Sequence, residues 1–296
     1  MGIAFQEIQF LLEGRRQGDF GETLTLGHQE LFLKRHQVGL WAREFSLDPS
    51  ALDACRRPYV DELLKTFCGA ADVVALDFAA YEGASITHDM NVPIPENLQQ
   101  RFDTVIDGGT LEHVFNFPIA LANCMKLLRP GGRLFLFTPA NSQMGHGFYQ
   151  FSPELLYRAL GPDHGFEVES IQAVQFRNIS TELGTVGAPL DVVDPALLAT
   201  RTVVASKRPV GLRVRARKTR HLERPFEMAP QQSDYVQAWA GLRKPDNSGG
   251  LSLANIWQAI SWRIPGSVKW PIWNEYGRLY RNTLRNRKWF RPIRKV

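Results

Sequence analysis

The sequence of 296 residues has few cysteines, none of them paired in sequence, and no long apolar run. Cys55, Cys68 and Cys124 lie far apart, which argues against a disulfide framework or a zinc knuckle and favours a reducing cytoplasm. No window approaches the roughly 18 consecutive apolar residues of a membrane-spanning helix. The first residues also lack the basic and apolar regions of a secretory signal. We therefore expect a cytoplasmic protein.

Histidine is present, but not in the pairing that metals favour on a helix. None of the seven histidines belongs to an H-E-x-x-H pattern, in which two imidazoles share one helix face. The sequence alone therefore predicts no metal site.

Charged residues are unevenly distributed along the chain. The net charge is +5, yet residues 262–296 hold ten Lys or Arg against the single acid Glu275. Within this tail, the spacing over 276–290 predicts a basic amphipathic helix rich in aromatics. Such a helix suits peripheral contact with an anionic membrane surface, and nucleic-acid phosphates are the weaker candidate partner. A solvated helix that docks on the domain through its aromatic residues is the alternative.

Short apolar runs in the first half of the chain predict buried strands. Residues 73–76 and 134–137 are continuous apolar runs of the kind found in parallel strands that are covered on both faces, and the run 102–106 repeats the pattern apart from Asp103 and Thr104. Helical spacing over 117–128 places a helix between the last two runs. Strands that alternate with helices predict an α/β fold with a doubly wound, mostly parallel, Rossmann-like sheet. Ligands of such sheets bind at the carboxyl ends of the strands.

The second half of the chain offers weaker signals. Residues 166–171 and 202–206 predict later strands, and Pro209 with the arginine-rich run that follows it indicates a boundary. We therefore divide the chain into a domain over 1–208 and a basic, tryptophan-rich, mainly helical extension over 209–296.

Residues 101–160 carry a series of specific motifs. They contain FD-x-V, then LEHV, a helix, LLRPGG and a further strand. This stretch of sequence resembles the class I S-adenosylmethionine-dependent methyltransferase superfamily, and most closely bacterial methyltransferase-like proteins of cell-surface sugar or metabolite pathways. The resemblance implies a Rossmann-like methyltransferase fold, S-adenosylmethionine as the cofactor and a transferase activity.

The resemblance also implies a set of cofactor-binding residues near strand ends. An acid after the second strand of the family accepts hydrogen bonds from the ribose hydroxyls, with an aromatic beside it, and a later acid takes the adenine amino group. In this sequence the set is Gly27, Gln29, Asp77, Phe78, Asp89, Met90 and Gly108. The structural alternatives are a turn-forming Asp77, a core Phe78 and a loop-capping Asp89.

The first loop departs from the family pattern. The family has glycines at alternating positions there, because the backbone must approach the cofactor with no Cβ in the way. Gly27 is retained, but Gln29 and Leu31 stand where further glycines are expected. The departure raises the alternative of a non-catalytic protein that kept the fold with weak or lost cofactor binding.

Five residues that follow the predicted strands 102–106 and 134–137 are candidates for acceptor chemistry. They are Asp107, Glu112, His113, His146 and Tyr149. Acids and histidines can orient an acceptor or take its proton, and methyl transfer needs no covalent protein intermediate. Capping and helix-dipole compensation are the alternative roles of the two acids, and a structural role is the alternative for His146.

Three function classes follow from these observations. The first is methyl transfer from S-adenosylmethionine to a small-molecule or glycan acceptor, the second a non-catalytic protein of this fold, and the third a nucleic-acid methyltransferase that uses the basic tail. The first accounts for most of the motifs, and we take it as the working hypothesis.

Overall fold

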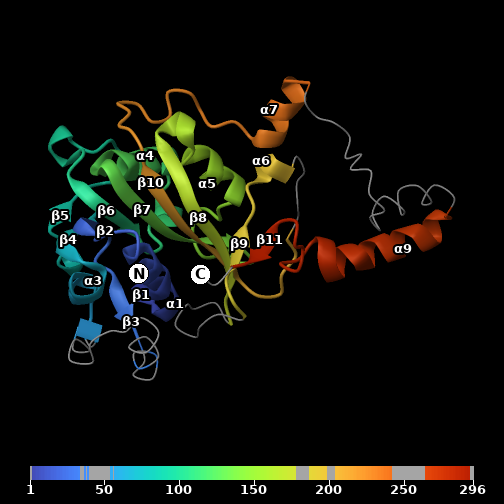
Figure 1. Ribbon diagram of the computed structural model, residues 1–296, viewed down its shortest axis with the longest axis horizontal. Helices are drawn as coiled ribbons and strands as arrows, with labels where there is room; N and C mark the ends of the chain where they lie inside the picture. The colour runs from blue at the N-terminus through green and yellow to red at the C-terminus, as the bar shows by residue number, and fades with distance from the viewer. Residues whose placement is uncertain are drawn as a thin grey trace.

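The computed structural model describes residues 2–33, 37, 39, 54–55, 57–177, 187–198, 204–241 and 264–293. In this part of the chain a nine-stranded sheet runs through the molecule, with helices on both of its faces (Figure 1). From one edge to the other, its strands are β11 (Phe290–Pro292), β9 (Leu190–Val192), β8 (Phe166–Gln175), β10 (Val210–Lys218), β7 (Leu128–Asn141), β6 (Phe102–Asp107), β2 (Gly21–Leu26), β4 (Ala70–Asp77) and β5 (Ile86–Thr87).

The sheet is parallel from β5 to β7 and antiparallel from β7 to β11. Strands β5, β4, β2, β6 and β7 pair in parallel, whereas β10 pairs antiparallel with both β7 and β8. Strand β9 and the edge strand β11 also pair antiparallel with their neighbours. The predicted α/β, doubly wound, mostly parallel fold is confirmed. A separate pair, β1 (Gly2–Ala4) and β3 (Glu30–Phe32), is parallel as well.

Helices cover the two faces of the sheet, and the sheet separates two apolar cores. The described helices are α1 (Phe5–Arg15), α3 (Asp61–Cys68), α4 (Phe117–Leu127), α5 (Pro153–Ala159), α6 (Pro195–Leu198), α7 (Ser233–Trp239) and α9 (Gly266–Tyr276). Side chains alternate along β7, so that Leu134 and Leu136 join the core under α4 and α5, while Phe135 and Phe137 join the core under α1 and α3. This alternation follows from the two-residue period of a strand. Burial on both faces explains why residues 134–137 of β7 are all apolar.

The predicted boundary at residue 208 does not coincide with the end of the sheet. Strand β10 begins at Val210 and lies inside the sheet, hydrogen-bonded on both sides, and β11 adds an edge from the last described residues. The strand predicted over 202–206 is wrong for 204–206, which form no regular element, and 202–203 lie outside the described residues. The arginine-rich strand β10 therefore lies inside the sheet, between β7 and β8.

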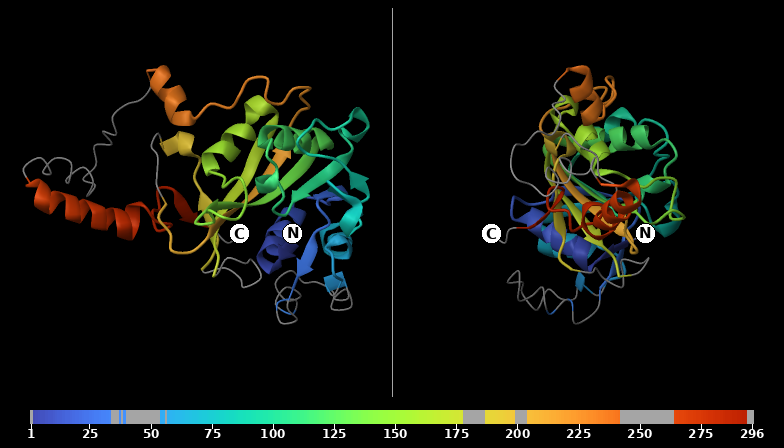
Figure 2. Two further views of the ribbon diagram at one scale, coloured as in Figure 1. Left: turned by 180° about the vertical axis from the view of Figure 1, so that it is seen from behind. Right: turned by 90° about the vertical axis from the view of Figure 1, so that its right-hand side faces the viewer.

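The helix predicted over 276–290 is also wrong. Helix α9 ends at Tyr276, a π-helical turn follows over Gly277–Arg281, and turns then lead into β11. The chain folds back because Trp289 and Phe290 are buried in the core next to β9. Helix α9 itself extends away from the body of the molecule (Figure 2). None of the described helices is long and apolar enough to cross a membrane.

Candidate functional site

The carboxyl ends of β2, β4 and β6 meet at one edge of the sheet and carry most of the predicted site residues. Gly27 follows β2 with a φ of +73°, in the left-handed region that favours glycine, and its N–H donates to the Leu76 carbonyl at 2.7 Å. Asp77 ends β4, and Asp107 ends β6. The parallel register brings these ends side by side, because Leu26 pairs with both Leu76 and Asp107.

A small cavity lies beside the ends of β2 and β4. It has a volume of about 190 Å³ and is lined by Asp77, Phe78, Asp89 and Met90, four of the predicted cofactor residues. The Phe78 ring is 74% exposed, so it is not the core aromatic that was the alternative. The Asp77 Oδ1 accepts a hydrogen bond from the Phe78 N–H at 2.6 Å. The structure thus brings these four residues together around one space.

Asp89 also organises the turn that closes this cavity. Its Oδ1 accepts from the backbone N–H of Asn91 at 2.9 Å and from the Asn91 side chain at 2.8 Å. These bonds lower the pKa of Asp89, so the group stays a carboxylate at neutral pH. The loop-capping role and a place in the cavity wall therefore coexist in Asp89.

Gln29 occupies the position that distinguishes this loop from the family pattern. Its side chain is fully buried, and its Nε2 donates to the Leu26 carbonyl. Its Oε1 has no hydrogen-bond partner among the described residues. The amide lies directly against Gly108, where an added Cβ would collide with Oε1. The two predicted cofactor residues Gln29 and Gly108 are therefore neighbours, and the glutamine fills space that a glycine would leave open.

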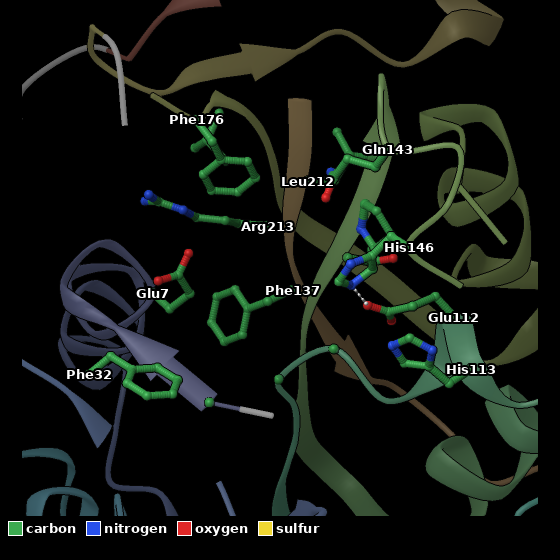
Figure 3. A pocket seen from close by; sticks show the side chains of 16 residues that line it. Glu7, Phe32, Glu112, His113, Phe137, Gln143, His146, Phe176, Leu212 and Arg213 are labelled. Carbon is green, nitrogen blue, oxygen red and sulfur yellow. Dashed lines mark ion pairs between the residues drawn. The ribbon is translucent and has the colours of Figure 1, made fainter. Parts of the chain in front are cut away.

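Two carboxylates and two histidines gather just beyond β6. Asp107 is fully buried; its Oδ1 accepts from the Thr110 N–H at 2.7 Å, and its Oδ2 has no partner among the described residues. Glu112 is 1% exposed and lies with Oε1 at 3.5 Å from the His146 Nε2 (Figure 3). Burial, and then the charge of Glu112, raises the pKa of Asp107 to about 8. The hydrogen bond with Glu112 raises the pKa of His146. The His113 and His146 rings lie 5.2 Å apart.

The loop that carries His146 is held against Glu112. The Phe148 and Tyr149 N–H groups donate to the Glu112 carbonyl at 2.9 and 3.2 Å. Gly147 passes so close that an added Cβ would lie 2.9 Å from this carbonyl. The backbone of 146–149 and the side chain of Glu112 are therefore positioned by the same contacts.

Tyr149 is not brought to the cavity with the other candidates. Its hydroxyl donates to the Phe115 carbonyl at 2.6 Å, and its ring packs against Phe117 and Phe151, with each centroid 5.9 Å away. It is absent from the lining of the large cavity described next. The predicted acceptor-orienting role of Tyr149 has no geometric support, because both its polar and apolar parts are engaged in the loop.

A cavity of about 660 Å³ opens between this cluster and the opposite wall formed by α1 and β10. Glu112, His113 and His146 line one side, and Glu7 and Arg213 line the other (Figure 3). His113 lines the smaller cavity too, so the two spaces adjoin at this residue. The smaller cavity therefore lies along the strand ends, and the larger cavity lies beside it.

Glu7 and Arg213 were not predicted as site residues. Arg213 is 3% exposed, yet its Nε and Nη2 atoms have no partner among the described residues, and the same holds for the Glu7 Oε2. Burial raises the pKa of Glu7 and lowers that of Arg213. The available signal for Glu7 was a charged residue at an otherwise apolar position of a helical pattern. Arg213 gave no such signal, because it is one of the alternating arginines of β10.

Comparisons with known proteins give a sequence match over part of the chain and several similar solved structures. Residues 46–136 match the sequence profile of a methyltransferase domain. No curated protein matches the sequence significantly. A Burkholderia thailandensis 1,6-didemethyltoxoflavin N1-methyltransferase, solved with bound 1,6-didemethyltoxoflavin and S-adenosylhomocysteine, is similar at 16% identity over 73% of this chain and 78% of that one, with a TM-score of 0.36.

Two further solved structures show the same level of similarity. TehB from Haemophilus influenzae is 11% identical over 71% of this chain and 62% of its own, with a TM-score of 0.39. The N-methyltransferase NodS from Bradyrhizobium japonicum, solved with S-adenosylhomocysteine, is 12% identical over 72% of this chain and 88% of its own, with a TM-score of 0.36.

Proposed function

From the membership of this chain in the class I S-adenosylmethionine-dependent methyltransferase superfamily, we propose that it transfers a methyl group to a small-molecule or glycan acceptor. The observation that carries the proposal is the pair of adjoining cavities at the strand ends. The smaller one suits the nucleoside part of the cofactor, and the larger one suits an acceptor. Such a site at the carboxyl ends of parallel strands is where open α/β sheets bind ligands.

The residues of the smaller cavity fit the adenosine half of S-adenosylmethionine. Asp77 supplies a carboxylate for two vicinal hydroxyls, Phe78 and Met90 supply apolar surface, and Asp89 supplies a further acceptor. When bound, the cofactor supplies a methyl group on a positively charged sulfur. The chain's own part is to hold the nucleoside, orient the acceptor and take up a proton where the acceptor is a hydroxyl or a protonated amine.

Gln29 bears in two opposite ways on binding of the methionine half of the cofactor. Its buried Oε1 has no partner among the described residues, and an unpaired buried acceptor fits a donor such as the ammonium of the cofactor. Its side chain also takes up volume beside Gly108 that the family pattern leaves free. The second observation favours the competing hypothesis of a non-catalytic protein with weak cofactor binding.

The larger cavity supports an acceptor with polar or charged groups. Arg213 offers unused donors on one wall, and Glu112 with His146 offers acceptors on the other. Phe32, Phe137 and Phe176 add apolar surface between them. A sugar or a small acidic metabolite combines these properties, because hydroxyls or a carboxylate pair with the polar walls and the ring or carbon skeleton covers the aromatics. In a reaction, His146 is an exposed group on this wall that can receive the acceptor's proton.

Cofactor binding is the measurement that separates the two hypotheses. We predict that calorimetric titration with S-adenosylhomocysteine shows one site in the wild-type chain. Asp77→Ala removes the hydrogen bonds to the ribose and should cost about 1.5 to 3 kcal/mol of binding free energy.

Asp72→Ala is the matched control, because Asp72 lies on the same strand, outside the cavity, and pairs with Lys65. Its affinity should equal that of the wild type. Absence of binding by the wild-type chain supports the non-catalytic alternative. Equal affinities of wild type and Asp77→Ala remove Asp77 from the site.

A further inference from the structure

Three candidate ligand atoms converge on the wall of the larger cavity. Glu112, His113 and His146 each offer one oxygen or nitrogen, and these atoms all lie within 4.8 Å of one another. Each side chain also lines the cavity. Two imidazoles and one carboxylate on one side of an open space form a set that divalent transition metals bind, with coordination positions left for a ligand.

The backbone fixes this set before any cation arrives. Glu112 and His113 belong to the short 3₁₀ turn Leu111–His113, in which the His113 N–H donates to the Thr110 carbonyl at 2.9 Å. His146 comes from the loop whose N–H groups bind the Glu112 carbonyl. Gly147 lets the loop pass close by, since an added Cβ would lie 3.1 Å from the His113 Nδ1. The two segments that carry the ligands are thus joined by hydrogen bonds.

An unpaired carboxylate oxygen in the cluster points to a missing positive partner. The Glu112 Oε2 is buried without a hydrogen bond among the described residues. Burying a carboxylate oxygen without a partner is costly, and buried charges in proteins are normally paired or bound to a metal. Within the described residues, the basic side chain that contacts Glu112 is His146, whose Nε2 lies 3.5 Å from Oε1 and not from the unpaired Oε2.

We propose that Glu112, His113 and His146 bind a divalent transition-metal cation whose open positions face the acceptor cavity. Mixed imidazole and carboxylate ligands favour Mn²⁺, Fe²⁺, Co²⁺, Ni²⁺ or Zn²⁺ over Mg²⁺ or Ca²⁺. The H-E-x-x-H pattern does not find such a site, because one histidine adjoins the glutamate and the other comes from a loop after the next strand.

The cation's role rests on the proposed function, and its binding does not. A bound cation orients an acceptor hydroxyl and lowers its pKa. The hydroxyl proton then leaves to water, the oxygen lone pair forms the new bond to the methyl carbon, and the electron pair of the carbon–sulfur bond stays on sulfur. The inference therefore specifies an oxygen acceptor, such as a sugar hydroxyl or another alcohol.

Cobalt titration of the full-length chain tests the site directly. Chelator-treated protein is titrated with Co²⁺ and followed by visible absorbance and by calorimetry. We expect one cation per chain. His146→Ala and His113→Ala should each weaken Co²⁺ binding at least about 10-fold, because even residues that only support metal ligands contribute that much. Glu112→Gln should do the same, because it removes the charge of the ligand.

His221→Ala is the matched control, since this histidine contacts Lys218 and Glu223 and lies outside the cluster. It should bind Co²⁺ like the wild type. Circular dichroism confirms that each variant is folded, and His146→Ala keeps the test decisive if the buried Glu112 does not tolerate substitution. The inference is overturned if the wild-type chain binds no Co²⁺, or if folded His146→Ala and His113→Ala bind it as tightly as His221→Ala.

A separate titration keeps the two proposals apart. S-adenosylhomocysteine binding in the presence of chelator reports on the cofactor site alone. Cofactor binding without Co²⁺ binding overturns the cation site and leaves proton uptake to His146, so the proposed function stands. Co²⁺ binding without cofactor binding supports the cation site and contradicts the proposed function.

Discussion

At the scale of single residues, Gln29 and Gly108 are in direct contact at the proposed cofactor site. The glutamine amide is buried against a glycine whose missing side chain makes room for it. The pair therefore behaves as one unit, in which the size of one residue limits the size of the other. Because packed interiors leave little free volume, such pairs show non-additive effects on stability.

We predict that Gly108→Ala lowers the free energy of unfolding by about 1 to 3 kcal/mol, because the added methyl collides with the Gln29 Oε1. In a Gln29→Gly background the same substitution should cost less than about 0.5 kcal/mol, since the obstacle is gone. Urea unfolding of the four proteins measures both values.

Gly145→Ala serves as the control, because an added Cβ there meets nothing within 4 Å. An equal cost of Gly108→Ala in both backgrounds would show that Gln29 is not the obstacle.

The candidate site could be predicted from the sequence only where a local pattern carries the information. Asp77 and Asp107 were found because apolar strands end at them and the carboxyl ends of parallel strands share one edge. Glu7 and Arg213 were missed, because they reach the same cavity only after α1 has packed beside β10. Tyr149 was assigned to the site from its loop position, and the hydrogen bond of its hydroxyl to Phe115 was not visible in sequence.

At the scale of elements, β10 shows why a strand was taken for a domain boundary. Its arginines alternate with Leu212, Val214 and Ala216, which are buried in the core under α4 and α5. The arginines point to the opposite face, where Arg215 pairs with Glu169 at 2.9 Å. Composition alone suggests a solvated basic segment, whereas the two-residue period indicates a strand. The period was the better guide here.

Lys218 at the end of β10 links this strand to α4. It is 2% exposed, and its Nζ donates to the carbonyls of Met125 and Leu128 at 2.8 and 2.7 Å. Burial lowers the pKa of Lys218 to about 8. Between this value and its ordinary value of about 10.4, the unfolded chain binds more protons than the folded chain at this residue. The penalty for burying the charge is full below pH 8 and is relieved as the pH rises.

We therefore predict that the unfolding free energy of the wild type, relative to Lys218→Met, rises by about 1 to 3 kcal/mol from pH 7.5 to pH 10.5. Chemical denaturation of both proteins across this range measures the difference, in which all other titrating groups cancel. Lys207→Met, at an exposed position, is the control and should track the wild type. A difference that stays constant or falls with pH would show that the charged form of Lys218 is not penalised in the fold.

At the scale of the whole molecule, the basic tail has two parts with different surroundings. Trp289 and Phe290 are buried, and β11 pairs with β9, so the end of the described chain belongs to the sheet. Helix α9 lies outside this body and exposes Trp270 and Ile272 by 57% and 49% (Figure 2). We propose that α9, with its surrounding positive charge, makes peripheral contact with an anionic membrane surface.

We predict that the full chain cosediments with phosphatidylserine-containing vesicles at low ionic strength, and that binding weakens steeply as salt shortens the range of electrostatic attraction. The double substitution Trp270→Ser with Ile272→Ser should reduce binding, because it removes the apolar contact and keeps the charge. Trp239→Ser, at an exposed aromatic on α7, is the control and should bind normally. Binding to single-stranded nucleic acid but not to vesicles would favour the nucleic-acid partner, and binding to neither would contradict the proposal.

The position of β10 between β7 and β8 has a consequence for synthesis of the chain on the ribosome. Both neighbours precede β10 in sequence, so they emerge first and cannot pair with each other in the final order. Until residue 218 has left the exit tunnel, two long strands of the nascent protein each expose a row of unpaired backbone groups. Such open edges invite pairing with other chains. Slowed elongation ahead of β10, or truncation before it, should therefore increase aggregation far more than truncation after β10 does.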